Sequence, residues 1–161
     1  MTTWATPRTW LSGEELTAAL LNQYVRDQQR VQSEAFIAYT PVWSSSGTQP
    51  VLGNGVYDAA YKQVGKHVEF RMKLTFGNTT TFGTGTYFFT YPVPALVANN
   101  PGLGGWAFRT GPAFFALTAV GFDTTKFRMI TSADNVLVTQ NAPVTFNDPD
   151  EINIGGVYEA A

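Results

Sequence analysis

Hydrophobic and polar residues alternate strictly between His67 and Phe76, and this is the clearest pattern in the chain. Successive side chains of a β-strand point to opposite faces of a sheet, so a period of two predicts a strand. The charged and polar residues of this stretch are expected to face water, as in a sheet with one solvated face. The apolar face, which we expect in the core, consists of Val68, Phe70, Met72, Leu74 and Phe76.

Shorter segments of the same kind follow from residue 39 to the end, each bounded by Gly, Pro, Asn or Asp. They are 55–63, 86–91, 106–109, 113–120, 126–131, 135–139 and 151–158. About eight short antiparallel strands at this spacing are typical of a β-sandwich or jelly roll. We therefore predict a mainly β domain of that class over residues 39–161. Within it, Tyr87, Phe89 and Tyr91 share one strand face, and Pro92 ends the strand because proline cannot donate to a ladder.

A different pattern precedes the strands. Residues 12–31 are rich in helix-forming residues, with apolar side chains three or four positions apart. Ser12 followed by Glu15 has the pattern of a capping box, which predicts that the helix begins at Ser12. Arg26 and Arg30 suit the negative end of the helix dipole. At about 100° per residue, one apolar sector collects Leu16, Leu20, Leu21, Tyr24, Gln28 and Val31.

This apolar sector needs a covering surface, and two interpretations are open: the β-domain of the same chain, or identical helices of other chains. The spacing of Tyr24, Gln28 and Val31, four residues and then three, is that of a coiled-coil seam and fits the second interpretation. Residues 1–11 form an arm whose tryptophans are typical of interfaces. We predict that residues 1–38 are an anchoring and oligomerising segment, with contacts made by Trp4, Trp10, Leu16, Leu20, Tyr24 and Val31.

The composition also indicates covered surface. The 161 residues are 44% apolar and 14% aromatic but only 14% charged, against roughly 25% charged residues in an average domain. A net charge of −2 without a basic run argues against nucleic-acid and anionic-membrane partners. The absence of cysteine excludes disulfides and thiolate metal sites. The opening residues lack a signal-peptide core and no apolar run approaches about 18 residues, so we expect a soluble protein made in a cytoplasm.

Residues that could support catalysis are few. His67 is the only histidine and lies on the predicted wet face of its strand, so a triad with Ser44, Ser45 or Ser46 is disfavoured. A carboxylate pair for glycoside cleavage could be drawn from Asp58, Glu69 and Asp123, but their spacing cannot be read from the sequence. We expect no enzyme activity and no cofactor.

The segment NDPDEIN, residues 147–153, offers oxygen ligands of the kind that Ca²⁺ prefers. It lacks the spacing of a defined calcium loop, and a turn cap is the favoured interpretation. We therefore expect no bound metal. Exposed aromatic rings could stack on sugars, and the candidates for a glycan contact are Trp43, Phe82 and Trp106; the alternative for each is a place in the core or in a subunit contact.

Several motifs in the first 95 residues form a recognisable series. A tryptophan-rich arm is followed by a helix with the pair Arg26 and Asp27, a G-N-G turn and a strand YKQVGKHVEF. A loop TTFGTG and a stop PVPA come next; these last four motifs are residues 53–55, 61–70, 80–85 and 92–95. The series resembles a group of small virion structural proteins, of the minor tail or head-decoration type, encoded by bacteriophages and prophages of actinobacteria.

This resemblance implies a bacteriophage virion component without enzyme activity. Its partners would be two further copies of the chain, in a homotrimer, and capsid or tail proteins bound by the N-terminal arm and helix, while the β-domain projects. A host cell-surface glycan is a further possible partner, and the alternative function is a carbohydrate- or receptor-binding module at the tip of a tail or capsid fibre. Residues 96–150 match no fixed pattern of this group.

Overall fold

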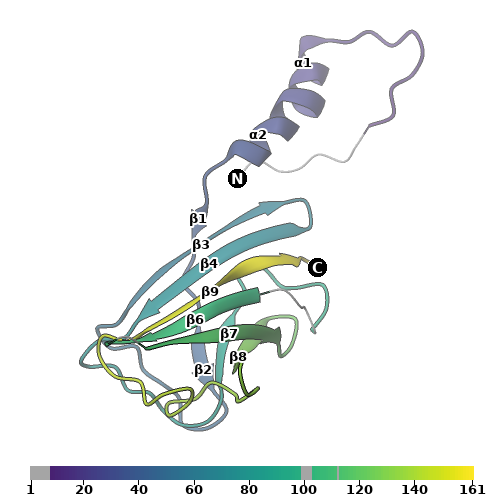
Figure 1. Ribbon diagram of the computed structural model, residues 1–161. Helices are drawn as coiled ribbons and strands as arrows, with labels where there is room; N and C mark the ends of the chain where they lie inside the picture. Colours follow the sequence, from purple (N-terminus) through teal and green to yellow (C-terminus); the bar gives the residue numbers. More distant parts are fainter. Residues whose placement is uncertain (1–7, 99–102, 112) are drawn as a thin grey trace. The chain divides into compact units, whose positions relative to one another are not determined.

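A computed structural model describes residues 8–98, 103–111 and 113–161, except for the side chain of Gln28. The chain divides into two compact units, the first ending at Phe36 and the second running from Ile37 to Ala161. We call them the helical unit and the β unit. They are drawn in Figure 1.

The helical unit contains one continuous helical stretch. It consists of α1 (Ala18–Leu21), a π-helical turn η1 (Asn22–Arg26) and α2 (Asp27–Ser33). Thr17 is the N-cap, because its side-chain oxygen accepts a hydrogen bond from the backbone N–H of Leu20 at 3.3 Å. In the described residues no helix is both long enough and apolar enough to span a bilayer.

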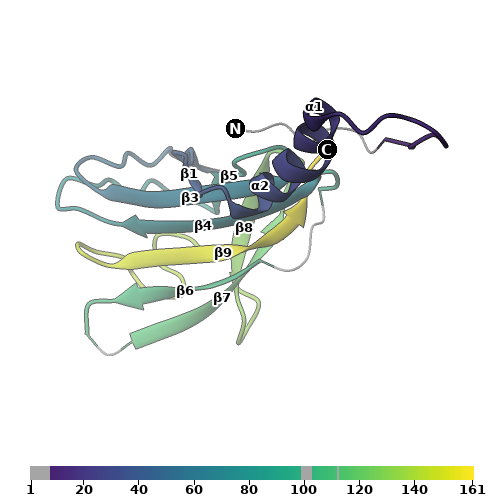
Figure 2. The same cartoon turned by 90° about the horizontal axis from the view of Figure 1, so that it is seen from above.

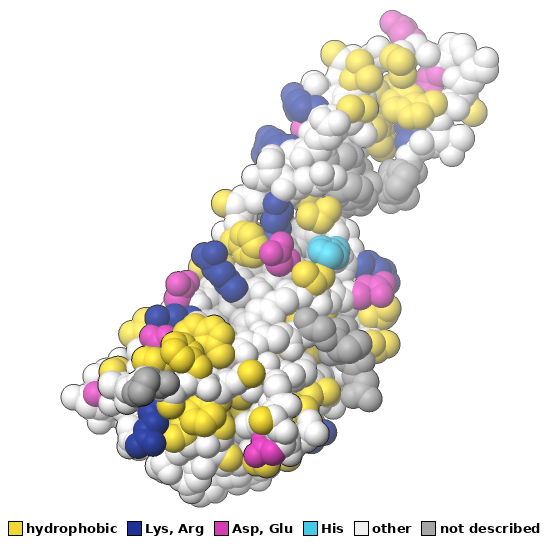
Figure 3. All heavy atoms as spheres, in the orientation of Figure 1, with side chains coloured by type: hydrophobic (Ala, Val, Ile, Leu, Met, Phe, Trp, Pro, Cys, Tyr) yellow, Lys and Arg dark blue, Asp and Glu magenta, His cyan; other side chains and the backbone are white. Residues whose placement is uncertain are grey.

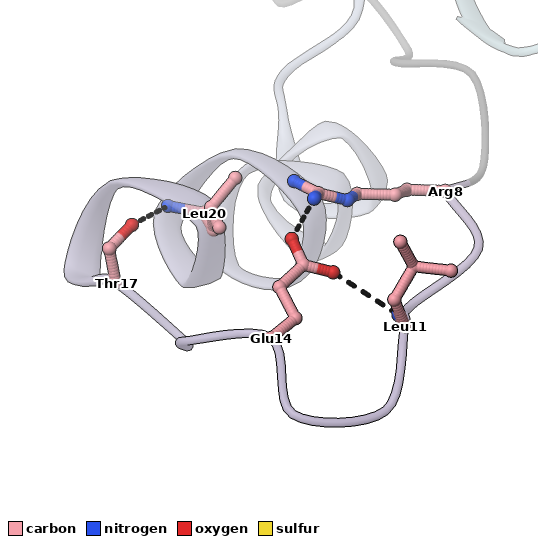
Figure 4. A network of polar contacts seen from close by, with 5 residues as sticks. All are labelled: Arg8, Leu11, Glu14, Thr17 and Leu20. Atoms are coloured by element: carbon pink, nitrogen blue, oxygen red, sulfur yellow. Dashed lines mark hydrogen bonds and ion pairs between the residues drawn. The ribbon is translucent and has the colours of Figure 1, made fainter.

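The predicted helix start at Ser12 is wrong. Residues 14–17 are not helical, and the Glu14 side chain bonds to the preceding loop and does not cap a helix. One Glu14 carboxylate oxygen accepts from the backbone N–H of Leu11 at 3.2 Å, and the other pairs with the guanidinium of Arg8 (Figure 4). Two short-range polar contacts therefore replace the capping box, and the helix begins only at Ala18.

The β unit is one antiparallel sheet of nine strands in the described part of the chain, ordered β1-β3-β4-β9-β6-β7-β8-β5-β2. Figures 1 and 2 show β3, β4, β9, β6 and β7 lying side by side in this order. The strands are β1 (Ile37–Ala38), β2 (Trp43–Ser45), β3 (Val56–Val64), β4 (His67–Thr75), β5 (Tyr87–Thr90), β6 (Leu103–Arg109), β7 (Ala113–Gly121), β8 (Lys126–Thr131) and β9 (Glu151–Glu159).

Most of the predicted strands are confirmed, and the alternation in β4 appears as alternating exposed and buried residues. The segment 135–139 is not a strand. It makes isolated bridges, with Leu137 opposite Ile130 and Thr139 opposite Ala142. The two-residue β1 and three-residue β2 at the sheet edges were not predicted, since segments this short carry no readable period.

The sheet curls into a half-barrel around a single core. Phe70 of β4 packs against Phe127 of β8, with ring centroids 5.8 Å apart, although three strands separate these two in the sheet order. Tyr91, just after β5, lies 6.4 Å from Phe70 and 5.1 Å from Phe127. The inner faces of distant strands therefore meet, and the mainly β, antiparallel class is confirmed.

Candidate binding surfaces

The helical unit exposes apolar side chains instead of enclosing them. Among the described residues, α1 and η1 contain no buried side chain. A hollow of about 340 Å³ is lined by six residues, all but one of them apolar. The apolar five are Trp10, Leu11, Leu16, Leu21 and Val25, whose exposed fractions range from 40% to 72%. The sixth is Glu14.

The arm is held beside the helix by polar and aromatic contacts. The Arg8 guanidinium lies 5.0 Å from the ring centre of Trp10 and 5.7 Å from that of Tyr24. The Trp10 and Tyr24 rings meet edge to face at 6.0 Å. Together with the Arg8–Glu14 pair in Figure 4, these contacts fix the position of Trp10 on the rim of the hollow.

The predicted anchoring residues have different positions. Trp10 and Leu16 are exposed, and Leu20 and Tyr24 are half-buried. Trp4 lies outside the described residues. Val31 is 3% exposed within the chain, and its assignment to an oligomer interface stays a prediction.

Sequence reasoning missed two residues that line the hollow, Leu11 and Val25. Leu16 precedes the helix, so a helical projection from Ser12 misplaces it. The π-helical turn changes the hydrogen-bond step from four residues to five, so the apolar sector cannot be continued across Asn22–Arg26 at a constant angle. The spacing between Leu21 and Val25, four residues, was the available signal for Val25.

A second surface lies on the outer face of the sheet, across β3, β4, β9 and β6. Asp58, Lys73, Asn153 and Trp106 are register partners in one row across these strands. The next row contains Ala60, Arg71, Gly155 and Gly104. Since two adjacent strands place glycine in that row, the face is hollowed there. The open hollow, which we call the glycine groove, has a volume of about 620 Å³ and is lined by both rows except Ala60.

Aromatic side chains border the glycine groove. The ring of Trp106 lies 5.5 Å from that of Phe114 and 6.4 Å from that of Phe108, both nearly edge to face. Trp106 remains 37% exposed and Phe114 66% exposed. Figure 3 shows hydrophobic side chains in patches on the β unit, next to charged ones. Of the three predicted glycan contacts, Trp106 is thus at the surface beside a hollow.

The other two predicted glycan contacts belong to the core side of the sheet. Trp43 is 9% exposed, with its ring 5.0 Å from Tyr87 and 5.5 Å from Phe76. Phe82 is partly buried and lies 4.9 Å from Phe76. These two rings pack on other rings of the β unit, and their assignment as glycan contacts stays a prediction.

The candidate catalytic residues are not brought together. The hydroxyl of Ser45 donates to the carbonyl of Thr48 at 2.7 Å, and that of Ser46 accepts from the N–H of Thr86 at 2.9 Å, so both serve a loop rather than His67. Asp58 lies opposite Lys73, four residues from Glu69 along β4, which is about 13 Å.

Asp123 and Asp150 stabilise turns. Asp123, between β7 and β8, accepts from the hydroxyl of Thr125 at 2.7 Å and from the backbone N–H groups of Thr125 and Lys126. The hydrogen bond from the Thr125 side chain is the largest cause that lowers the pKa of Asp123. Asp150, 1% exposed, accepts from the N–H groups of Thr110 and Asn147 at 2.8 Å and 2.9 Å.

The segment NDPDEIN therefore forms a turn, in which the Asp150 carboxylate accepts backbone hydrogen bonds from Thr110 and Asn147. Among the described residues there is no group of three or more His, Cys, Asp or Glu side chains placed to hold a metal ion.

Comparison with known proteins found no matching family model, no matching curated protein and no matching solved structure.

Proposed function

We propose that the protein is a non-enzymatic component of a bacteriophage particle, a homotrimer that attaches to the capsid or tail through its helical unit while the β unit projects. The observation that carries this proposal is the exposed apolar hollow of the helical unit. The β unit has a complete core, whereas α1 and η1 have no buried residue in the described chain. A helical segment of this composition is stabilised when something covers it.

The magnitude of the apolar exposure supports association. Complete burial of a Leu, Val or Trp side chain contributes roughly 1.5–3 kcal/mol. The five apolar residues of the hollow are 40–72% exposed, so covering them would contribute roughly 5 kcal/mol per chain. Association costs on the order of 4–15 kcal/mol in lost freedom, which the sum over several chains can exceed. The number of three chains comes from the resemblance, and this estimate supports self-association without fixing the number of copies.

The motifs that carry the resemblance form a turn, a hairpin and a bridge of the β unit, which fits a scaffold role. The turn Gly53–Gly55 is tied to the loop after β4, because the backbone N–H of Asn54 donates to the Thr79 hydroxyl at 2.8 Å. The strand motif 61–70 forms the β3–β4 hairpin. The stop at 92–95 meets the chain terminus, where Ala95 and Ala160 form a bridge. A jelly-roll arrangement of the β unit is part of the proposal.

Sedimentation equilibrium of the full chain tests the oligomeric state. We expect a particle of three times the 17.6 kDa chain mass. The double variant Leu21→Asp/Val25→Asp should sediment as a monomer with an unchanged β unit. The matched control is Leu96→Asp/Val97→Asp, because those residues of the β unit have similar exposed fractions, 42% and 52% against 43% and 45%. A monomeric wild-type protein contradicts the homotrimer, and a trimeric Leu21/Val25 variant contradicts the interface.

Incorporation into particles tests the attachment. In the phage that encodes the chain, virions assembled with the Leu21→Asp/Val25→Asp variant should contain at least tenfold less of the protein on immunoblots than virions assembled with the control variant. Equal incorporation of the two variants would overturn attachment through the helical unit. Immunogold labelling of the β unit then distinguishes a capsid from a tail position.

A further inference from the structure

The glycine groove has the features of a binding site on the β unit. Its floor lies where Gly104 of β6 and Gly155 of β9 face each other in register. A larger residue at either position would place its side chain on the outer face, in the row that includes Arg71 on β4 and Thr118 on β7. An open hollow of about 620 Å³ lies at this place on the outer face of the sheet.

No neighbouring atom makes glycine necessary at position 104. A Cβ at this position would meet no atom within 4 Å in the described part of the chain. Glycine within a strand costs roughly 0.5–1 kcal/mol relative to alanine, and it often marks a place where a ligand approaches the backbone. The hollow at Gly104 is therefore open space over an ordinary strand, maintained at a cost in stability.

Polar groups and one aromatic ring converge on this space. Trp106 forms one wall and is supported from behind by Phe108 and Phe114. Asn153, its register partner, has a side-chain nitrogen that is buried and has no hydrogen-bond partner within the described protein. An unpaired buried amide is costly, and a ligand acceptor would satisfy it.

The charges around the glycine groove are balanced. Arg71 and Lys73 contribute two positive charges, and Asp58 contributes a negative one. Glu151 adds a second negative charge through its ion pair with Lys73, in which Oε1 lies 2.6 Å from Nζ. The groove therefore has several hydrogen-bonding groups but no net charge to select an anion or a cation.

We propose that the glycine groove binds a neutral saccharide. A pyranose ring has an apolar face of C–H groups, which suits the exposed Trp106 ring, and a rim of hydroxyls that can donate and accept. Those hydroxyls match the charged and amide groups of Asp58, Arg71, Lys73 and Asn153. A few oriented polar groups around an aromatic surface are typical of ligand sites.

A second copy of the chain suits the glycine groove less well. The centres of protein interfaces are depleted of charged residues, whereas three charged side chains line this groove. The saccharide proposal goes beyond the anchoring function and uses a different surface, so each can fail without the other.

The test is a screen of the full-length protein on an array of neutral and uronic-acid-containing oligosaccharides, followed by calorimetry with the strongest neutral ligand. We expect Trp106→Ala and Gly104→Val each to weaken binding at least tenfold. Gly104→Val fills the hollow with a residue that favours strands, so its unfolding midpoint should not fall, which separates lost binding from lost fold. Phe122→Ala, an exposed aromatic outside the groove, is the matched control and should bind as wild type.

Amide chemical shifts locate the ligand. Saturation with the neutral oligosaccharide should move the resonances of Gly104, Gly155 and the Asn153 side-chain amide more than those of Gly65. The proposal is overturned if no neutral saccharide binds, if only acidic ones bind, or if both groove variants bind as wild type. It is also overturned if these resonances shift on self-association instead, which would make the groove a contact between copies.

Discussion

Gly105 of β6 lies so close to the backbone carbonyl of Asn153 on β9 that no Cβ fits between them. Its neighbour Gly104 has open space at the same point of its backbone. Glycine is therefore required by the backbone packing at position 105 but not at position 104. Gly105 lets β6 and β9 approach on the core side, and Gly104 leaves the outer face hollow.

Substitution of these neighbours should have opposite effects on stability. Gly105→Ala pushes β6 away from β9, and we expect a loss of roughly 2–3 kcal/mol in the free energy of unfolding. Gly104→Ala should be neutral or stabilising by up to about 1 kcal/mol. Urea denaturation followed by circular dichroism measures both. A Gly105→Ala protein as stable as wild type would contradict the close approach of the two strands.

Tyr158 of β9 connects the C-terminal strand to the proline segment after β5. Its hydroxyl donates to the Val93 carbonyl at 2.6 Å and accepts from the Val93 N–H at 3.1 Å. Tyr158→Phe removes both bonds and leaves two backbone groups unpaired, so we expect a loss of roughly 1–3 kcal/mol on urea denaturation. Tyr24→Phe, on the helical unit, is the control and should change stability by less than about 0.5 kcal/mol.

Stability should fall at alkaline pH. Burial raises the pKa of Tyr158 to about 12, and likewise that of Tyr91 to about 12, against about 10 in an unfolded chain. Above pH 10 the unfolded state loses these protons first, so the free energy of unfolding decreases as pH rises from 10 to 12. Denaturation series at pH 8, 10 and 11 should show this decrease, and Tyr158→Phe should reduce its slope. A flat profile would contradict the burial of both hydroxyls.

The turn at Asp123 should weaken in acid. A lowered pKa in the folded state means that the ionised carboxylate adds stability above the unfolded pKa of about 3.9, and that this contribution is lost as pH falls below it. Asp123→Asn should therefore destabilise the protein at pH 7 and match wild type at pH 2. In a Thr125→Val background, which lacks the hydrogen bond from the Thr125 hydroxyl, the Asp123→Asn substitution should cost less at pH 7. An equal cost of Asp123→Asn at both pH values would rule out this linkage.

Phe70 should be among the most sensitive core positions. Its ring contacts Tyr39, Tyr91, Phe127 and Tyr158, which come from both halves of the curled sheet. Phe70→Ala should cost roughly 3–5 kcal/mol. Phe114→Ala, which removes the same group from a 66% exposed position, should cost less than about 1 kcal/mol. Comparable losses in the two variants would contradict the placement of the core.

Local patterns predicted the strands well and the helix start poorly. The alternation in β4 specifies one strand with one buried face wherever its partners lie, so Val68, Phe70, Met72 and Leu74 could be assigned to the core. The capping box at Ser12 competes with other local hydrogen bonds of similar strength. Arg8 and Leu11 engage Glu14, and the small difference between these alternatives cannot be read from residue types alone.

The burial of Trp43 and of Trp106 could not be predicted from the sequence either. Both are tryptophans near turn-rich segments, yet Trp43 lies in the inner aromatic cluster and Trp106 on the outer face. A strand of three residues has too few positions to reveal which face is buried, so β2 gave no indication for Trp43.

By itself, the sequence determined the antiparallel β class, the helical segment before it and the inward face of β4, because these depend on periodicities of neighbouring residues. Only the tertiary structure decided that the strands form one curled sheet and that Gly104, Gly155, Arg71 and Trp106 meet on its outer face. These residues lie on three strands far apart along the chain. Their neighbourhood depends on strand order and register, which are set by packing across the whole sheet.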